Sequence, residues 1–509
     1  MGVVARQSIK GSIVNYIGTG IGFITTFFVL TTTLTATEIG ITRVLIEIAT
    51  VFAGFAQLGT SSSIIKFYPY FKDEKSHDNG FFFWTLVIPF IGFLIYGFLF
   101  LLLKAPVESF FAKESPEFIP YYYFIFPLGF FMLYMAIFET NSNVLLRIVV
   151  PKFVREILVR VLTLASYLIY HCGIVNFYGF IIIFCSIYAV AAIIDLIYLL
   201  SFKRISLKPN FKVITKSLKR EYLLYTSFLI VAALAGQITP AINTFFISNK
   251  MGLHFTGIYT IALFMASMID IPYRSLGAIS QPHLSQAMKD NDIKTANVLC
   301  KKVSLHQLIA GSFIFFAIWI NVDLFFELLP NGDQYAPAKW VFFFLGLSRI
   351  YNSVLSIGTS VLAYSKYYYY SLIFTAILTV SAIFLNIKLI PLYGMEGAAI
   401  ASLLAYVINY ALLLGLVGFT IKTNPFSFNQ VKVIIIILIM FLFNYLLVTF
   451  VKPMILSINI NSLVAKSIDA ILRTSILSAL GVITIYKLKI SNEINTLIDR
   501  FIHLNRFIK

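Results

Sequence analysis

Two charged residues four positions apart, Arg43 and Glu47, lie in the stretch TRVLIEIA inside a long apolar run. On a helix they share one face, so a guanidinium and a carboxylate would meet in a place that otherwise consists of hydrocarbon. A charge at the centre of a bilayer costs at least about 2.5 to 3.5 kcal/mol on insertion scales. The pair therefore predicts either a structural ion pair that holds its helix in register or part of the wall of a water-filled cavity.

Polar residues continue along the same helix face and recur on four other apolar segments. Within each stripe most of them follow at steps of three or four, which is the spacing of one helix face. Five such stripes predict a wet cavity and favour the cavity interpretation of the first pair. The stripes contain Arg43, Glu47, Thr50, Gly54, Gln57 and Ser61; Asn15, Thr19, Gly22 and Thr26; Gln237 and Asn243; Thr256, Thr260, Ser267, Asp270 and Arg274; and Arg349, Asn352, Ser356 and Ser360.

Further charges fall in other apolar segments. We expect Arg160 and Asp195 to face protein or water and to find partners, because a lone charge in lipid is costly. Arg349 has no acid within one turn on its own helix, which favours a functional role for it. The charges of the last apolar segment are interpreted as structural; they are Lys466, Asp469 and Arg473.

The composition requires that membrane helices hold these residues. The chain has 509 residues, 59% of them hydrophobic and 12% charged, with a mean hydropathy of +0.88, which is too apolar for a soluble domain. A bilayer core about 30 Å thick needs roughly 20 apolar residues per helix. The sequence predicts an all-α polytopic membrane protein with about fourteen spans, at residues 11–33, 40–65, 81–103, 119–143, 154–171, 176–200, 221–247, 254–276, 304–328, 339–363, 369–388, 393–420, 431–451 and 463–486.

Lysine and arginine residues predict the orientation of these spans. About three quarters of the 39 Lys and Arg residues fall in alternate connections, which become cytoplasmic when both termini are inside. The formal charge of +17 is therefore mostly an orientation signal and no sign of a nucleic-acid partner. The first span follows Arg6 and Lys10 without a cleavage site, so we expect it to remain as a signal anchor.

An internal duplication predicts the domain organisation. Tyr178 aligns with Tyr393 at an offset of 215, and Gly40 aligns with Gly257 at an offset of 217. A nearly constant offset and six spans per block indicate a parallel repeat, although chance similarity between apolar helices is an alternative. The predicted parts are an N-lobe (1–200), a basic cytoplasmic linker (201–220), a C-lobe (221–421), two extra helices (422–490) and an amphipathic tail on the inner leaflet (491–509).

The sequence predicts no enzyme, metal site or cofactor. The cysteines are far apart and the histidines never fall at ligand spacing. The stretch GTGIGF (Gly18 to Phe23) lies within a span with no strand before it, so it indicates close helix packing and not a nucleotide loop. No connection outside the membrane exceeds about a dozen residues, which leaves no room for the catalytic domain of a glycosyltransferase or polymerase.

Four segments resemble the prokaryotic polysaccharide transporters, including Wzx-type O-antigen flippases, of the multidrug/oligosaccharidyl-lipid/polysaccharide exporter superfamily. The resemblance covers essentially the whole chain, and each motif by itself is loose. The segments are LTATEIGITRVLIEIATVFAGFAQLGTSSSIIKFYPYF (Leu34 to Phe71), MIDIPYRSLGAISQPHLSQAMKDND (Met268 to Asp292), GLSRIYNSVLSIGTSVLAYSKYYY (Gly346 to Tyr369) and LIPLYGMEGAAIASLLAYVINY (Leu389 to Tyr410).

The resemblance implies a MATE-like fold in which two lobes form a V around a cavity that opens alternately to either side of a bacterial inner membrane. It implies as substrate an undecaprenyl-pyrophosphate-linked oligosaccharide, with H+ or Na+ as a coupling ion and a polysaccharide polymerase or ligase as further partners. A pyrophosphate needs cations in a cavity of low dielectric. The resemblance would assign that role to Arg43, Arg160, Arg274 and Arg349.

Three alternatives remain open at this point. A cation-coupled multidrug exporter of the same fold is disfavoured, because many such exporters carry an acid in the first helix and residues 11–33 contain no Asp or Glu. A flippase for a peptidoglycan lipid precursor would share the cationic cavity. An enzyme of the same pathway is disfavoured by the short outer loops.

Overall fold

The computed structural model describes residues 14–15, 17–73, 76–202, 205–211, 215–450 and 462–507, with side chains except at 228–237, 278 and 501–507. These residues form helices and connections, with no strand among them. They divide into two compact units. Unit 1 comprises Met1–Ile261 and Thr375–Ala398, and unit 2 comprises Ala262–Phe374 and Ala399–Lys509.

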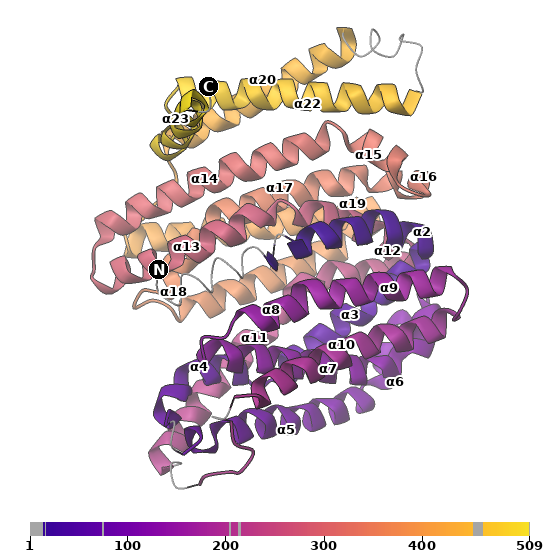
Figure 1. Ribbon diagram of the computed structural model, residues 1–509, viewed down its shortest axis with the longest axis vertical. Coiled ribbons are helices and arrows are strands. Elements are labelled where there is room, and N and C mark those ends of the chain that lie inside the picture. Colours follow the sequence, from indigo (N-terminus) through magenta and orange to yellow (C-terminus); the bar gives the residue numbers. More distant parts are fainter. Residues whose placement is uncertain are drawn as a thin grey trace. The chain divides into compact units, whose positions relative to one another are not determined.

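The helices of unit 1 run along a common direction in Figure 1, with α7 between α5 and α10. The first helix, Ile17–Thr33, includes η1 and α2. The elements are η1 (Thr25–Leu30), α2 (Thr31–Thr33), α3 (Ala36–Ala56), α4 (Thr60–Phe71), η2 (Asp78–Gly80), α5 (Phe81–Leu102), α6 (Lys104–Phe111), η3 (Pro116–Phe124), α7 (Ile125–Val144), α8 (Val149–Phe153), η4 (Val154–Leu158), α9 (Val159–His171), α10 (Phe177–Leu200), α11 (Lys216–Met251) and the start of α12 (Leu253–Ser267).

Unit 2 packs α14 against α13, α17 and α20, and α20 against α22, as Figure 1 also shows. The 51-residue helix α19 (Tyr370–Thr420) contributes to both units and contains a non-helical residue, Gly394. The remaining elements are α13 (Asp270–Lys289), α14 (Ile293–Trp319), α15 (Val322–Leu328), α16 (Gly332–Tyr335), η5 (Ala336–Ala338), α17 (Lys339–Leu355), α18 (Ile357–Ala363), α20 (Phe428–Phe450), α22 (Ser462–Lys487) and α23 (Asn492–Phe507).

This is the all-helical membrane architecture that the composition predicts. Within the described ranges, eight helices are long and apolar enough to cross a membrane, or ten if two bent pairs each count as one span. One of the eight is α19, which covers two of the predicted spans, and the first helix is shorter than the others. The number fourteen and the lobe boundaries at residues 200 and 221 stay predictions.

The helix that carries Arg43 begins with a capping box. The Thr35 hydroxyl accepts a hydrogen bond from the Glu38 backbone N–H at 3.3 Å, and the Glu38 carboxylate accepts one from the Thr35 N–H at 2.8 Å. Such reciprocal bonds satisfy two backbone donors that the first turn leaves open. The helix ends before Leu58 and Gly59, whose φ angles of 47° and 71° are left-handed. The predicted span 40–65 therefore contains two helices, α3 and α4, which together form one candidate membrane span, Ala36–Phe71.

Two glycines of the predicted repeat meet in one helix crossing within unit 1. A Cβ atom on Gly40 would overlap the backbone carbonyl of Leu253, and a Cβ atom on Gly257 would overlap that of Ala36. The absence of side chains at both positions lets the backbones of α3 and α12 approach closely. Residues 36 and 40 differ from 253 and 257 by the same 217 positions, so the contact is reciprocal.

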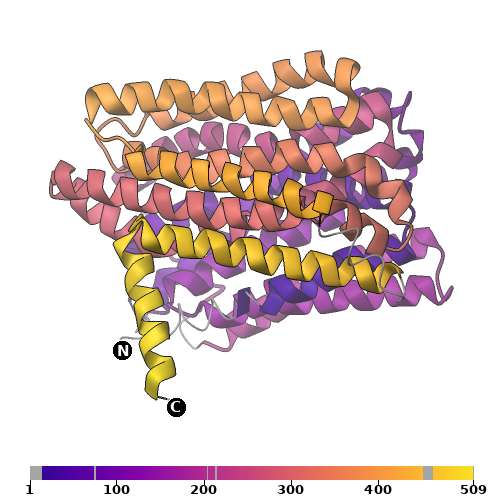
Figure 2. The same ribbon diagram turned by 90° about the horizontal axis from the view of Figure 1, so that it is seen from above.

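The tail helix α23 turns away from the direction of α22 and runs across it in Figure 2. The Tyr486 hydroxyl donates to Asp499 at 2.6 Å, and the Asn495 amide donates to the Tyr486 carbonyl at 2.9 Å. Lys302 of α14 pairs with Glu493 at 2.7 Å. The location of this amphipathic helix on the inner leaflet stays a prediction. Residues 508–509 of the predicted tail lie outside the described residues.

Candidate functional site

The first candidate pair forms as the sequence predicts. Arg43 and Glu47 make an ion pair one turn apart on α3, and Glu47 is 7% exposed while Arg43 is partly exposed. Thr50, one turn further, donates its hydroxyl to the Ile46 carbonyl at 2.7 Å. A buried carboxylate beside a guanidinium of intermediate exposure is a neutralised site from which the arginine can reach a polar group.

The lower end of this stripe crosses the break between α3 and α4. Gln57 caps the end of α3, and Ser61 in the first turn of α4 donates its hydroxyl to the Gln57 side chain at 2.6 Å. Both residues are partly exposed. The hydrogen bond therefore joins the two halves of the stripe across the left-handed turn at Leu58 and Gly59.

The predicted first stripe lies beside Arg160. The Thr19 hydroxyl donates to the Asn15 carbonyl at 2.8 Å, and Arg160 of α9 donates to the Gly18 carbonyl. Arg160 also pairs with Glu156 at 3.0 Å. The Asn15 side-chain oxygen is buried and has no hydrogen-bond partner among the described residues. The guanidinium of Arg160 thus ties the first helix to α9 through a backbone acceptor.

The second candidate pair joins two helices of unit 2. Arg349 of α17 lies 3.4 Å from the carboxylate of Asp270, which begins α13 and is 8% exposed. Arg274, one turn further on α13, also acts electrostatically on Asp270. Asn352 of α17 accepts a hydrogen bond at 2.7 Å from the hydroxyl of Tyr410. Arg349 has no acid within one turn on α17, and Asp270 of α13 provides its counter-charge.

Two tyrosines of α19 complete this second cluster and were not predicted. Tyr406 interacts electrostatically with both Arg349 and Asp270, and its ring stacks on Tyr410 with centroids 6.1 Å apart. The sequence carries a signal for them, because positions 406 and 410 share one helix face. Nothing in the sequence says which other helix that face meets.

The polar residues predicted on α11 and α12 do not all form the wall of a cavity in the part of the chain that the structure describes. The side chain of Gln237 lies outside the described residues. Asn243 donates to the Tyr259 hydroxyl at 2.6 Å and accepts from Asn386 at 3.0 Å. Thr256 and Thr260 are buried, and their hydroxyls bond backbone carbonyls one turn earlier. These two threonines therefore satisfy their own helix and do not face a water-filled space.

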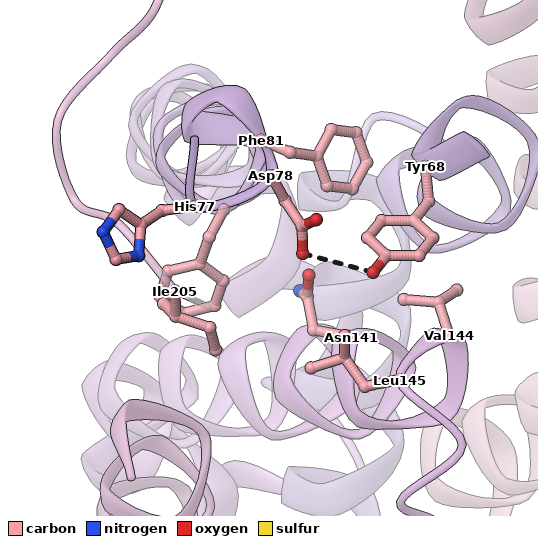
Figure 3. A pocket seen from close by; sticks show the side chains of 9 residues that line it. Tyr68, His77, Asp78, Phe81, Asn141, Val144, Leu145 and Ile205 are labelled. Atoms are coloured by element: carbon pink, nitrogen blue, oxygen red, sulfur yellow. Dashed lines mark hydrogen bonds between the residues drawn. The ribbon is translucent and has the colours of Figure 1, made fainter. Parts of the chain in front are cut away.

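A small cavity of about 20 Å³ lies elsewhere, beside the turn that precedes α5. Figure 3 shows Asp78 and Tyr68 directed toward each other in its wall, with the tyrosine hydroxyl donating at 3.2 Å. Asn141 and Ile205 also line it (Figure 3). A space of this size holds about one water molecule. It is too small for a glycan or a drug, and none of the predicted site residues lines it.

The expectation that every buried charge finds a partner is wrong for Asp195. This residue of α10 is 0% exposed, and neither carboxylate oxygen accepts a hydrogen bond from the residues that the structure describes. Near it, Arg155 of η4 pairs with Glu139 of α7 at 2.7 Å. Sequence reasoning identified Asp195 as a charge in an apolar segment and missed the Arg155–Glu139 pair.

A family model described as "Polysaccharide biosynthesis protein" matches residues 4–288, more than half of the chain. The chain belongs to this family. The family recognised from the four sequence segments is thereby confirmed. None of the curated proteins matches the chain in sequence.

Solved structures confirm the fold expected of this polysaccharide biosynthesis protein. The lipid II flippase MurJ in an inward closed conformation is 16% identical, with a TM-score of 0.70 over 93% of this chain and 98% of that one. An inward-facing multidrug resistance MATE transporter is 14% identical, with a TM-score of 0.60 over 83% and 98%. A mutant of the MATE transporter VcmN of Vibrio cholerae is 13% identical, with a TM-score of 0.56 over 81% and 96%.

These similarities make the polysaccharide biosynthesis protein a multi-pass membrane protein with a transporter fold related to those of MurJ and the MATE exporters. At such low identity the structures speak for the fold alone. In the part of the chain that the structure describes, no group of three or more His, Cys, Asp or Glu side chains is placed to hold a metal ion. The charged groups found instead are Arg–acid pairs, which suit the reversible binding of an anion.

Proposed function

We propose that the protein is a flippase that moves an undecaprenyl-pyrophosphate-linked oligosaccharide from the cytoplasmic to the periplasmic leaflet for the synthesis of a surface polysaccharide such as O-antigen. The lobes alternate access to a cationic cavity, while the lipid tail stays in the bilayer. Cofactors and catalysis have no part in this function. A coupling ion, H+ or Na+, and a polymerase or ligase are its further partners.

The observation that carries the proposal is the ion pair of Arg43 and Glu47 inside a membrane helix of a polysaccharide biosynthesis protein. A guanidinium offers two parallel N–H donors that match the oxygens of a phosphate, and it stays charged at any physiological pH. Arg274 and Arg349 supply further positive charge beside Asp270, and Arg160 supplies it beside Glu156. We assign these arginines to the pyrophosphate and to acidic sugars.

The paired acids stabilise the arginines while the site is empty. Removing a guanidinium from water without a counter-charge costs several kcal/mol, which Glu47 and Asp270 offset while no substrate is bound. An arriving pyrophosphate offers Arg43 a bidentate partner in place of the single carboxylate. The amides and hydroxyls of Asn15, Thr19, Gln57, Gln237 and Asn352 are proposed to meet the sugar hydroxyls.

The orientation follows from the distribution of Lys and Arg. With both termini in the cytoplasm, the basic connections all lie on the inner side of a bacterial cytoplasmic membrane. The cationic cavity then loads from the cytoplasm and delivers its cargo to the periplasm.

Two other cargoes are separable from this one. A multidrug exporter would bind cationic or neutral drugs, and the positive charge of the arginines repels the cationic ones. A peptidoglycan lipid precursor shares the pyrophosphate, and the family match is what favours a polysaccharide precursor over it.

The test uses a bacterial strain that lacks its own flippase and accumulates lipid-linked oligosaccharide. We expect the wild-type chain to restore surface glycan, Arg43→Ala to abolish it and Arg43→Lys to restore part, because an ammonium lacks the planar fork. Lys466→Ala is the matched control, since Lys466 forms an exposed pair with Glu327 at 2.7 Å. Normal export by stably inserted Arg43→Ala would make the pair structural, and rescue of a strain that lacks lipid II flipping alone would favour the other cargo.

A further inference from the structure

A completely buried carboxyl, to which no described residue donates a hydrogen bond, lies outside the candidate site. Asp195 of α10 is 0% exposed, and both of its oxygens lack a partner among the described residues. One turn earlier, Ala191 belongs to an apolar cluster with Val154 and Val159. A lone carboxylate in such surroundings costs several kcal/mol, whereas the neutral acid avoids most of that cost.

Two charged residues on neighbouring helices act electrostatically on Asp195. They are the acid Glu139 of α7 and the cation Arg155 of η4. Arg155 bonds Glu139 at 2.7 Å and Glu156 at 3.2 Å. The Arg155 side chain is 42% exposed and that of Glu139 is 14% exposed, so these two lie nearer to water than Asp195. The other charged or basic groups on the elements packed against α10 are Glu117, Lys152, Glu156, Arg160 and His171.

The backbone at Arg155 departs from the regular helix. Residues Val154–Leu158 form a π-helical stretch, η4, that packs against α10. Such π-helical stretches are frequently found at functional sites. A shift of this stretch by part of a turn would change which acid Arg155 meets.

We propose that Asp195 is a proton-binding site, which carries its proton in this conformation and passes it to Glu139 when Arg155 moves from Glu139 to Asp195. The exchange conserves charge, because one neutral acid and one Arg–carboxylate pair are present before and after it. The O–H bond of Asp195 breaks and an O–H bond on Glu139 forms. Glu139, which is partly exposed, then releases the proton to water. The inference concerns a proton and does not rest on the proposed cargo.

The test measures the protonated carboxyl directly, without substrate. The full chain in lipid nanodiscs is titrated by infrared difference spectroscopy, which detects the C=O stretch of a neutral carboxylic acid. We expect such a band near neutral pH in the wild type and its loss in Asp195→Asn. The matched control is Asp270→Asn, whose carboxyl has an arginine partner at 3.4 Å, and the band is expected to remain.

Two further variants test the exchange through opposite shifts. In Glu139→Gln, Arg155 loses its acid on α7, so it is free to pair with Asp195, and the band should vanish at a lower pH than in the wild type. In Arg155→Gln the band should persist to a higher pH, and this half-exposed site is expected to tolerate the change. A wild type with no band at any pH, a band that survives in Asp195→Asn, or shifts of the same sign in both variants would overturn the proposal.

Discussion

The Arg–acid pairs Arg43–Glu47 and Asp270–Arg349 differ in the part of the fold that fixes them. Arg43 and Glu47 are one turn apart on α3, so their distance is set by the helix itself. Asp270 and Arg349 come from α13 and α17, so their distance depends on how these helices pack. The first pair therefore suits a permanent ligand for substrate, and the second suits a link that breaks or forms when helices of unit 2 shift.

The largest effect is expected from leaving Glu47 without its partner. Arg43→Ala should lower the free energy of unfolding by about 3 to 5 kcal/mol, because it leaves a buried charge unpaired. The double variant Arg43→Ala, Glu47→Ala should regain much of that stability without regaining transport. Thermal unfolding in nanodiscs and surface-glycan yield measure the two properties. Transport by the double variant would assign both residues to structure alone.

The pair between helices is expected to respond to exchange of its charges. Asp270→Asn should destabilise the protein by about 3 kcal/mol and slow transport, because Arg349 loses its counter-charge. The swapped variant Asp270→Arg, Arg349→Asp should restore stability, since the link between α13 and α17 is reformed with opposite polarity. The same swap at positions 43 and 47 should restore stability but not transport. Equal behaviour of both swaps would remove the distinction drawn between the pairs.

A smaller effect is expected at the hydroxyl of Tyr410. Tyr410→Phe removes the 2.7 Å hydrogen bond to Asn352 and should cost about 1 kcal/mol of unfolding free energy. Tyr393→Phe is the matched control, because Tyr393 is exposed. Thermal unfolding of both variants measures the difference. A change in transport beyond a few-fold for Tyr410→Phe would show that this hydroxyl of α19 acts in transport as well as in packing.

The smallest effect is expected at the exposed pair that holds the tail. The hydrogen bond from Lys302 lowers the pKa of Glu493 to about 2. Since the folded-state pKa is depressed, this contact stabilises the tail above the ordinary glutamate pKa of about 4.3 and is lost as the pH falls toward 2. Lys302→Gln removes this contact, so it should raise the pKa of Glu493, weaken the attachment of the tail at neutral pH and leave transport nearly unchanged. Fluorescence anisotropy of a label at Cys-substituted Leu497 reports the release of α23.

The sequence predicts most of what depends on local spacing. Arg43 and Glu47 pair because an interval of four residues brings them together on any helix. The family and the helical membrane fold also follow from composition, hydropathy and short motifs. Each of these properties depends on the residues of single segments and not on how the segments pack against one another.

What the sequence does not predict depends on contacts between distant segments. The partners Asp270 and Arg349 are 79 positions apart, and only the packing of α13 on α17 brings them together. The isolation of Asp195 is likewise a property of α7, η4 and α10 jointly. Gly59 indicates a possible break after α3, because glycine readily adopts a left-handed backbone. Leu58 has the same left-handed backbone, and its residue type does not indicate it.

The reciprocal crossing of α3 and α12 bears on the origin of the chain. Gly40 meets Leu253 while Gly257 meets Ala36, so positions that the predicted repeat makes equivalent contact each other. This is the contact that two identical subunits make about a two-fold axis. An ancestor of half the length, carrying one such glycine, would have had a self-complementary surface for dimerisation. Gene fusion would then have preserved an interface that already existed and freed each copy to acquire its own charges.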